Sequence, residues 1–162
     1  MIWKAISLWQ PWASLWLSPR KIHETRHWQT PHRGWLLVHA AKHRSAVVSA
    51  PLREILERQF GARWEIELPR GAIIGRVELL DCIATDSFPI SHCTTPDYFC
   101  GDFSNGRYGW KRGAFEVFAD PIPYRGQQSM FDVHGEMDGR GFKLLPKPPA
   151  PQGTLAFTEA HT

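Results

Sequence analysis

The stretch that decides the fold is residues 2–17, IWKAISLWQPWASLWL. Its first half is mostly apolar, as short buried strands are. Pro11 then stands where a helix can begin, because the first helical position needs no backbone N–H. Trp12, Leu15 and Trp16 follow with the i, i+3, i+4 spacing of a buried helical stripe. We therefore expect a buried strand that passes directly into a short, buried helix.

The rest of the chain contains one clear helix and several more strands. Residues 51–60 carry apolar side chains on one face and charged side chains on the other, with Ser49 as a cap and Gly61 as a stop, which predicts an amphipathic helix. Residues 85–107 are rich in Ser, Thr, Pro, Asp and Gly, which predicts a long loop. We expect strands at residues 2–8, 21–28, 34–41, 72–84 and 108–118, and a turn-rich crossing at 120–126. This pattern predicts an α+β protein, a small and partly closed β-barrel with two or more flanking helices.

Length and composition limit the class of protein. The 162 residues are 43% hydrophobic and 22% charged, which is typical of one globular domain. No apolar run approaches the roughly 20 residues that span a bilayer, and no secretory signal is visible, so we expect no membrane association. Three cysteines, an odd number, favour a cytoplasmic location over a disulfide framework. Several prolines predict an extended tail over residues 143–162, behind a domain at 1–142.

Positive charge and tryptophan gather in the first third of the chain. Residues 1–44 hold seven Lys and Arg but one acid, a net charge of +6, whereas the remainder holds 12 Lys and Arg against 15 Asp and Glu, a net charge of −3. Six of the eight tryptophans lie within the first 35 residues. Basic side chains pair with phosphates and aromatic side chains stack on bases, so this mixture favours a single-stranded nucleic-acid partner. The alternative is a solvated charged surface over a tryptophan-rich core.

The densest group of polar side chains is residues 21–28, KIHETRHW. In an extended segment the side chains alternate between faces, so Glu24, Arg26 and Trp28 would share one face. A turn near Lys21 would bring its amine back toward Glu24. Such a pair is a structural ion pair, a clamp on a ligand or an acid/base pair, and the residues alone leave all three open.

Other candidate contacts stand at the end of a predicted strand. His39 and Lys42 end the strand at 34–41, and strand ends that face a cleft often meet polar ligands. His39 fits a hydrogen-bonded core position equally well, and Lys42 fits a solvated one. The His, Cys and Asp residues between positions 92 and 102 lack the short spacing of a zinc clip, so we expect no metal site. The sequence also lacks a phosphate-binding loop and a Gly-x-Ser-x-Gly elbow.

Several motifs, in one order along the chain, resemble the ASCH domain family. They are residues 8–15 (LWQPWASL), 21–28 (K-x-x-E-T-R-x-W), 30–34 (TPHRG), 39–42 (HAAK) and 71–82 (GAIIGRVELLDC). The resemblance implies a PUA-like β-barrel with helices around one cleft, and relatives of this class bind RNA, including modified nucleotides. It places five residues at that cleft: Gln10, Trp12, Lys21, Glu24 and Arg26.

Two enzymatic branches of the family imply an alternative. One bacterial relative is an amidohydrolase acting on acetylated cytidine, and it uses a Lys, a Thr three residues on and a later Glu. Lys21 matches here, but Glu24 stands at the Thr position, and Glu78 is the candidate for the later Glu. Another bacterial relative is a ribonuclease that cuts single-stranded RNA. The resemblance therefore also implies a hydrolase in which Lys21 and Glu24 are the catalytic residues.

The function that we expect is a nucleic-acid-binding module that holds single-stranded RNA or a modified nucleotide in a basic, aromatic-lined cleft. The cations would meet phosphates, the tryptophans would stack on bases, and Glu24 would accept a hydrogen bond from a base amino group. The alternatives are the hydrolase and a protein-interaction module in transcriptional regulation. We expect no cofactor, apart from a divalent metal if the chain is a nuclease. The predicted contacts with nucleic acid are Gln10, Trp12, Lys21, Glu24, Arg26, Trp28, Arg33, His39 and Lys42.

Overall fold

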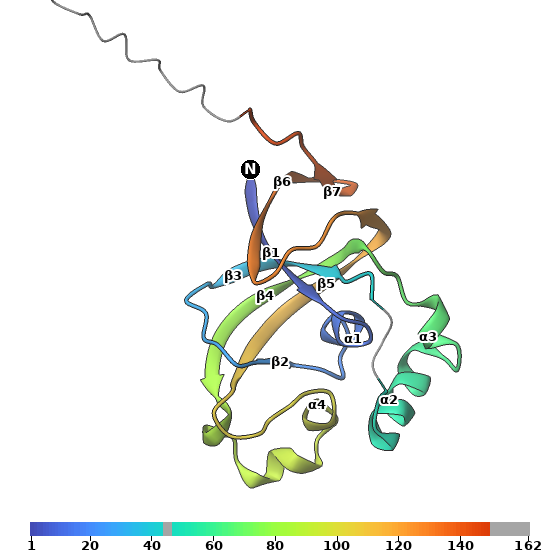
Figure 1. The fold of residues 1–162 in the computed structure, drawn as a ribbon, viewed down its shortest axis with the longest axis vertical. Coiled ribbons are helices and arrows are strands. Elements are labelled where there is room, and N and C mark those ends of the chain that lie inside the picture. Colours follow the sequence, from blue (N-terminus) through green and yellow to red (C-terminus); the bar gives the residue numbers. More distant parts are fainter. Residues whose placement is uncertain (44–46, 150–162) are drawn as a thin grey trace, which may run out of the picture.

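The computed structural model describes residues 1–43 and 47–149, which form a seven-stranded mixed sheet with helices around it (Figure 1). The strands are β1 Ile2–Leu8, β2 His23–Arg26, β3 Gly34–Ala40, β4 Ala72–Ala84, β5 Tyr108–Pro123, β6 Met130–Asp138 and β7 Gly141–Leu144. The α-helices are α1 Trp12–Trp16, α2 Ala50–Phe60, α3 Trp64–Glu67 and α4 Pro96–Phe99, and the 3₁₀ helices are η1 Thr85–Ser87 and η2 Ile90–Thr94. No helix in this part of the chain has the length and hydropathy of a membrane span.

The sheet places strands next to one another that are distant in the sequence. Its order is β2-β5-β4-β3-β1-β6-β7, so the N-terminal strand lies inside the sheet. Strand β1 is parallel to β3 and antiparallel to β6, and β4 pairs with β5 along a ladder interrupted by register shifts. The α+β class is confirmed, whereas the prediction of a β-barrel is wrong. Among the described residues the sheet stays open, because its two edge strands, β2 and β7, have four residues each and form no ladder with each other.

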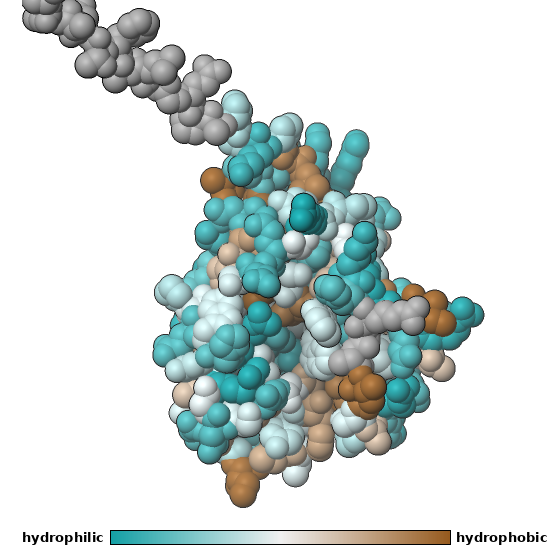
Figure 2. All heavy atoms as spheres, in the orientation of Figure 1, coloured by the Kyte–Doolittle hydropathy of each residue, from teal (hydrophilic) through white to brown (hydrophobic). Residues whose placement is uncertain are grey.

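The core is divided between the two faces of the sheet by alternation along its strands. Ile6 belongs to the cluster that packs against α1, where Trp16 is fully buried. Ala5 and Leu37 belong to a second cluster with aromatic side chains of β5, β6 and β7. On another side of α1, Leu15 packs against α2 and α3. Because successive strand residues face opposite ways, this period of two decides which side chains meet α1. The outer surface in Figure 2 is mostly hydrophilic, with hydrophobic residues in small separate groups.

Most predicted elements lie near their predicted bounds. The helix expected at 51–60 is α2, capped by the Ser49 side chain, which accepts a hydrogen bond from the backbone N–H of Leu52. It ends at Gly61, whose φ of 89° favours glycine. The strand expected at 72–84 is β4 with those bounds, and the strand expected at 2–8 is β1.

Three parts of the prediction differ from the structure. Residues 85–107, expected as a loop, contain η1, η2 and α4, and α4 forms because Thr95 caps a turn that begins with Pro96. Residues 120–126, expected as turns, are partly strand, since β5 continues to Pro123. Strands β6 and β7 and the short helix α3 were not predicted. Residues 143 and 144 of the expected tail belong to β7, and residues 150–162 lie outside the described part of the chain.

Candidate functional site

A large open cavity lies between the end of β1, β2, the end of β3 and the loop at residues 124–129. Its volume is about 1490 Å³. Aromatic and basic side chains dominate its wall, which holds a single acid. The aromatic residues are Trp9, Trp12, Trp28 and Tyr124, the cations are Arg26, Lys42 and Arg125, the histidines are His27, His39 and His43, and the acid is Glu24.

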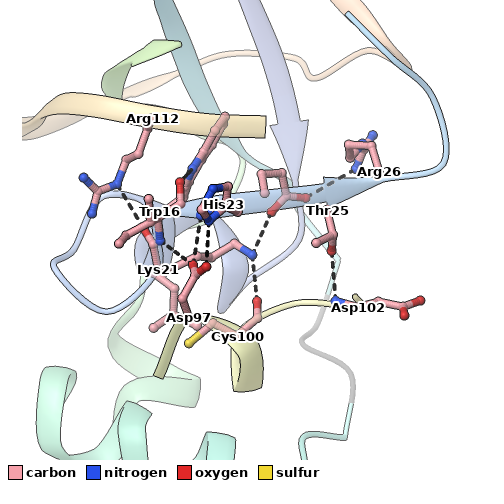
Figure 3. A network of polar contacts seen from close by, with 12 residues as sticks. Trp16, Lys21, His23, Thr25, Arg26, Asp97, Cys100, Asp102 and Arg112 are labelled. Atoms are coloured by element: carbon pink, nitrogen blue, oxygen red, sulfur yellow. Dashed lines mark hydrogen bonds and ion pairs between the residues drawn. The ribbon is translucent and has the colours of Figure 1, made fainter. Parts of the chain in front are cut away.

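Glu24 lines the cavity and Lys21 lies behind it. The Lys21 side chain is 0% exposed, and its Nζ donates a hydrogen bond to the carbonyl oxygen of Cys100 at 2.7 Å. The same Nζ lies 3.2 Å from Glu24 Oε2, so the expected approach of Lys21 to Glu24 is confirmed. Figure 3 shows the Lys21 side chain pointing toward the carbonyl group of Cys100. Lys21 is absent from the cavity lining. Lys21 therefore influences the cavity indirectly, through its ion pair with the Glu24 carboxylate.

Arg26 lies on the other side of the Glu24 carboxylate. Its Nη1 is 3.8 Å from Glu24 Oε1, and its guanidinium lies 5.9 Å from the centroid of the Trp28 ring. Trp28 packs edge-on against Trp110, with 4.6 Å between ring centroids. The Nε of Arg26 is buried and has no hydrogen-bond partner among the described residues. A buried donor without a partner costs about 1–3 kcal/mol.

Asp97 fastens the segment that carries Cys100 to the beginning of β2. Its Oδ1 accepts hydrogen bonds from the backbone N–H groups of Ile22 at 2.6 Å and His23 at 2.9 Å. Its Oδ2 lies 2.7 Å from His23 Nδ1 and 2.9 Å from His92 Nε2. Burial raises the pKa of Asp97, but the hydrogen bonds from the two histidines lower it more, so the pKa lies well below its ordinary value. The ionised carboxylate thus keeps the carbonyl group of Cys100 in place.

The same three side chains are donors that a divalent metal could use. One ligand atom from each of His23, His92 and Asp97 lies within 4.8 Å of the others. In this structure the two histidine rings form hydrogen bonds with Asp97 Oδ2, so the carboxylate has partners without a metal ion. None of the three lines the cavity, so the cluster acts on the site through the position of β2.

His39 holds the loop at 124–129 against the sheet. Its Nε2 lies 2.9 Å from the carbonyl oxygen of Tyr124, and its Nδ1 lies 2.8 Å from Ser7 Oγ. Burial lowers the pKa of His39, opposed in part by the hydrogen bond to Tyr124, so the ring is neutral at pH 7. Because a carbonyl oxygen only accepts, Nε2 carries the proton and the Ser7 hydroxyl donates to Nδ1. His39 is therefore a hydrogen-bonded core residue that also forms part of the cavity wall.

The remaining predicted contacts divide between the cavity and its surroundings. Trp12 and Lys42 line the cavity, and the Lys42 side chain is exposed. Gln10 is fully buried, where its side-chain amide bonds to the helix α1 and to a distant carbonyl group, and it lies outside the lining. Arg33 is exposed on the surface outside the lining. Glu78 lies on β4 and is also outside it. The structure thus brings together Trp12, Glu24, Arg26, Trp28, His39 and Lys42.

Sequence reasoning missed one wall of the cavity. This wall is the loop at 124–129, which contributes Arg125. Elsewhere in the lining, Trp9 and His43 were also missed, and their ring centroids are 5.4 Å apart. The only signal was the turn-rich character of residues 120–126. Nothing local connects these residues with the basic third of the chain, since the contact between His39 and Tyr124 spans 85 residues.

Comparison with known proteins gives this geometry a context. The model of the ASCH domain matches residues 6–99. The chain is 38% identical over 88 residues to activating signal cointegrator 1 of Homo sapiens, and 35% identical over 86 residues to activating signal cointegrator 1 of Mus musculus. Each alignment covers 51% of this chain but 15% of the relative, so the chain spans a small part of those proteins. The matched residues include β2, whereas the loop at 124–129 lies beyond them.

Proposed function

The chain belongs to the ASCH domain family, and we propose that it binds single-stranded RNA, or a modified nucleotide within it, in the cavity beside Glu24. Family membership supports nucleic-acid binding in general. The composition of the cavity wall supports this particular place on the molecule and a single-stranded ligand, whose bases are free to stack.

The observation that carries the proposal is the mixture of side chains around one cavity. Tryptophan rings stack on bases of any sequence, and lysine and arginine pair with phosphates. The lining holds three tryptophans and three such cations against one acid. Its volume of about 1490 Å³ is larger than most small-molecule sites, which span roughly 300–1,000 Å³. A segment of polymer therefore fits this cavity better than one small metabolite does.

Glu24 and Arg26 offer complementary groups at the base-binding end of the cavity. The Glu24 carboxylate accepts hydrogen bonds only, and the Arg26 guanidinium donates only. The edge of a base carries donors and acceptors side by side, so this pair suits a base amino group next to a ring acceptor.

Lys21 is a positioning residue in this proposal. Its Nζ is shared between the Cys100 carbonyl oxygen and the Glu24 carboxylate, and its side chain does not reach the cavity wall. The ammonium group would therefore hold the Glu24 carboxylate oriented toward a base. Phosphate contacts would come from the two other cations that line the cavity, Lys42 and Arg125.

Fluorescence anisotropy with a short labelled RNA tests the proposal across a range of salt concentrations. Two phosphate contacts predict a slope of log K against log salt of about −1.4, at roughly 0.7 per contact for a single strand. Arg125→Ala should weaken binding and flatten the slope by about 0.7. Arg33→Ala removes the same charge outside the cavity and is the matched control.

Absence of binding at low salt would refute the proposal. Binding with no salt dependence would refute the predicted phosphate contacts. An equal loss in Arg33→Ala and Arg125→Ala would show that the charge of the whole surface, and not the cavity, determines affinity.

The same preparation separates binding from hydrolysis. Single-stranded RNA and acetylated cytidine are each incubated with the protein, with and without a divalent metal. A module that only binds leaves both unchanged. Turnover by the parent that disappears in Glu24→Gln would replace this proposal with the hydrolase.

A further inference from the structure

A second cavity lies on the other side of the loop at residues 124–129. Its volume is about 550 Å³. It shares Tyr124, Gln127 and Gln128 with the first cavity, so one loop is the wall between the two. The other lining residues come from β1, from β6, from the end of β7 and from the segment that follows it.

The dividing loop is held in place by close packing. The hydrogen bond from His39 fixes the carbonyl group of Tyr124. A Cβ atom on Gly126 would lie 2.6 Å from His39 Cε1 and 2.8 Å from Ser7 Oγ, so the loop backbone lies directly on the sheet. These contacts therefore fix the position of the loop that separates the two cavities. On top of this loop, Gln127 and Gln128 are exposed and form no hydrogen bonds with other described residues.

The second cavity combines an apolar floor with a basic rim. Met130, Phe131 and Leu144 contribute the apolar surface. At the rim, Lys4 is paired with Asp132 at 2.6 Å, whereas Lys147 forms no ion pair within the described part of the chain. The rim therefore presents one free ammonium group beside a surface on which a ribose or a base can lie.

We propose that the second cavity is a subsite for the nucleotide that adjoins the one bound beside Glu24, and that the RNA strand crosses the loop over Gln127 and Gln128. This inference rests on the proposed function. The two amide side chains would bond to the backbone at the crossing, and Lys147 would meet the phosphate beyond it. Tyr124 lines both cavities, and its ring is stacked on Phe131, with 6.1 Å between centroids, so the wall at the crossing is rigid.

A series of oligonucleotide lengths tests this path. Nucleoside monophosphates and homo-oligomers of two, three and four nucleotides are titrated by calorimetry against the parent, Lys147→Ala and Lys143→Ala. Lys143 is an exposed lysine of β7 that lies outside both cavities, so Lys143→Ala is the matched control. Affinity of the parent should rise from one nucleotide to two or three. Lys147→Ala should reduce the affinity for the longer oligomers by about two- to fivefold, the range expected for one exposed charge pair, and leave that for the monophosphate unchanged.

A second variant, Asp132→Asn, is expected to raise the affinity for longer oligomers, whereas Lys147→Ala is expected to lower it. Asp132→Asn removes the acid of the second cavity and frees Lys4, and the exposed pair that it breaks contributes little to stability. Longer oligomers should bind more tightly, by about two- to fivefold, while the monophosphate is unaffected. If monophosphates bind but affinity does not rise with length, or if Lys147→Ala and Lys143→Ala behave alike, the subsite is refuted while the first cavity stands. If no nucleotide of any length binds, both proposals fail.

Discussion

Replacing Lys21 by methionine removes one buried positive charge while keeping a long, unbranched side chain. In the parent, Lys21 Nζ donates to the Cys100 carbonyl oxygen and pairs with Glu24. In Lys21→Met, the Cys100 oxygen loses its donor. The Glu24 carboxylate, whose side chain is 8% exposed, keeps only the more distant contact with Arg26, at 3.8 Å. We expect the protein to be strongly destabilised.

The magnitude follows from these contacts. Breaking a buried ion pair by removing one partner costs about 3–5 kcal/mol, because the other charge remains buried. A hydrogen bond to a charged group contributes about 1.5–3 kcal/mol, but the two terms share one ammonium group and do not add. The expected loss is therefore about 3–5 kcal/mol. For a chain of this size, each kcal/mol corresponds to about 2–4 °C, so Tm should fall by about 6–20 °C.

Calorimetric melting of Lys21→Met, two other single variants and one double variant measures this effect. Lys42→Met removes an exposed lysine of the same cavity, so it should melt like the parent and yet bind RNA more weakly. Glu24→Gln removes the charge that Lys21→Met leaves unpaired. The double variant should therefore lose less stability than the sum of the single variants, by about 0.5–3 kcal/mol.

A Lys21→Met protein that melts within about 2 °C of the parent, a loss of at most about 1 kcal/mol, would refute the reasoning. Such a result, together with weaker RNA binding, would mean that the lysine contacts the ligand directly. Strict additivity in the cycle with Glu24 would refute the claim that the pair acts as one unit.

Three further outcomes are expected. Trp16→Ala should cost about 3–5 kcal/mol in denaturant unfolding, because the ring is fully buried against the sheet, and a parent-like midpoint would contradict this placement. Because the pKa of Asp97 is lowered in the folded protein, its carboxylate stabilises the fold above the ordinary pKa of about 3.9, and this stabilisation is lost as the pH falls below that value. Asp97→Asn should therefore be less stable than the parent at pH 7, and its free energy of unfolding should change less than that of the parent between about pH 2 and 4. Gly126→Ala should shift the dividing loop, because its Cβ would meet the His39 ring at 2.6 Å, and cost about 1–3 kcal/mol in thermal melting; unchanged stability and unchanged RNA affinity would show that the loop is not held as described.

Local sequence patterns determined most elements of the first 84 residues, with the exception of the short helix α3. The strand at 2–8, the capped helix that starts after Ser49 and the strand at 72–84 all depend on periodicity, capping and stop signals that lie within a few residues of one another. The pairing of Lys21 with Glu24 was also predictable, because the two residues are three positions apart. The family itself was recognisable from motifs in the same part of the chain, and its model matches residues 6–99.

The order of the strands and the depth of each side chain depend on contacts between distant residues. Lys21 can be buried because a carbonyl oxygen 79 residues away accepts a hydrogen bond from its ammonium group, and a charged lysine leaves water only when such partners are present. The sheet remains open because β6 pairs with β1 and places β7 at the edge opposite β2. Strand β6 was not predicted from the sequence. The loop at 124–129 forms a wall of the cavity because His39 reaches it across 85 residues. Local composition carries no information on such pairings, so the sequence by itself determined the elements, the family and the charged pair, whereas only the tertiary structure decided which of the predicted residues face the cavity.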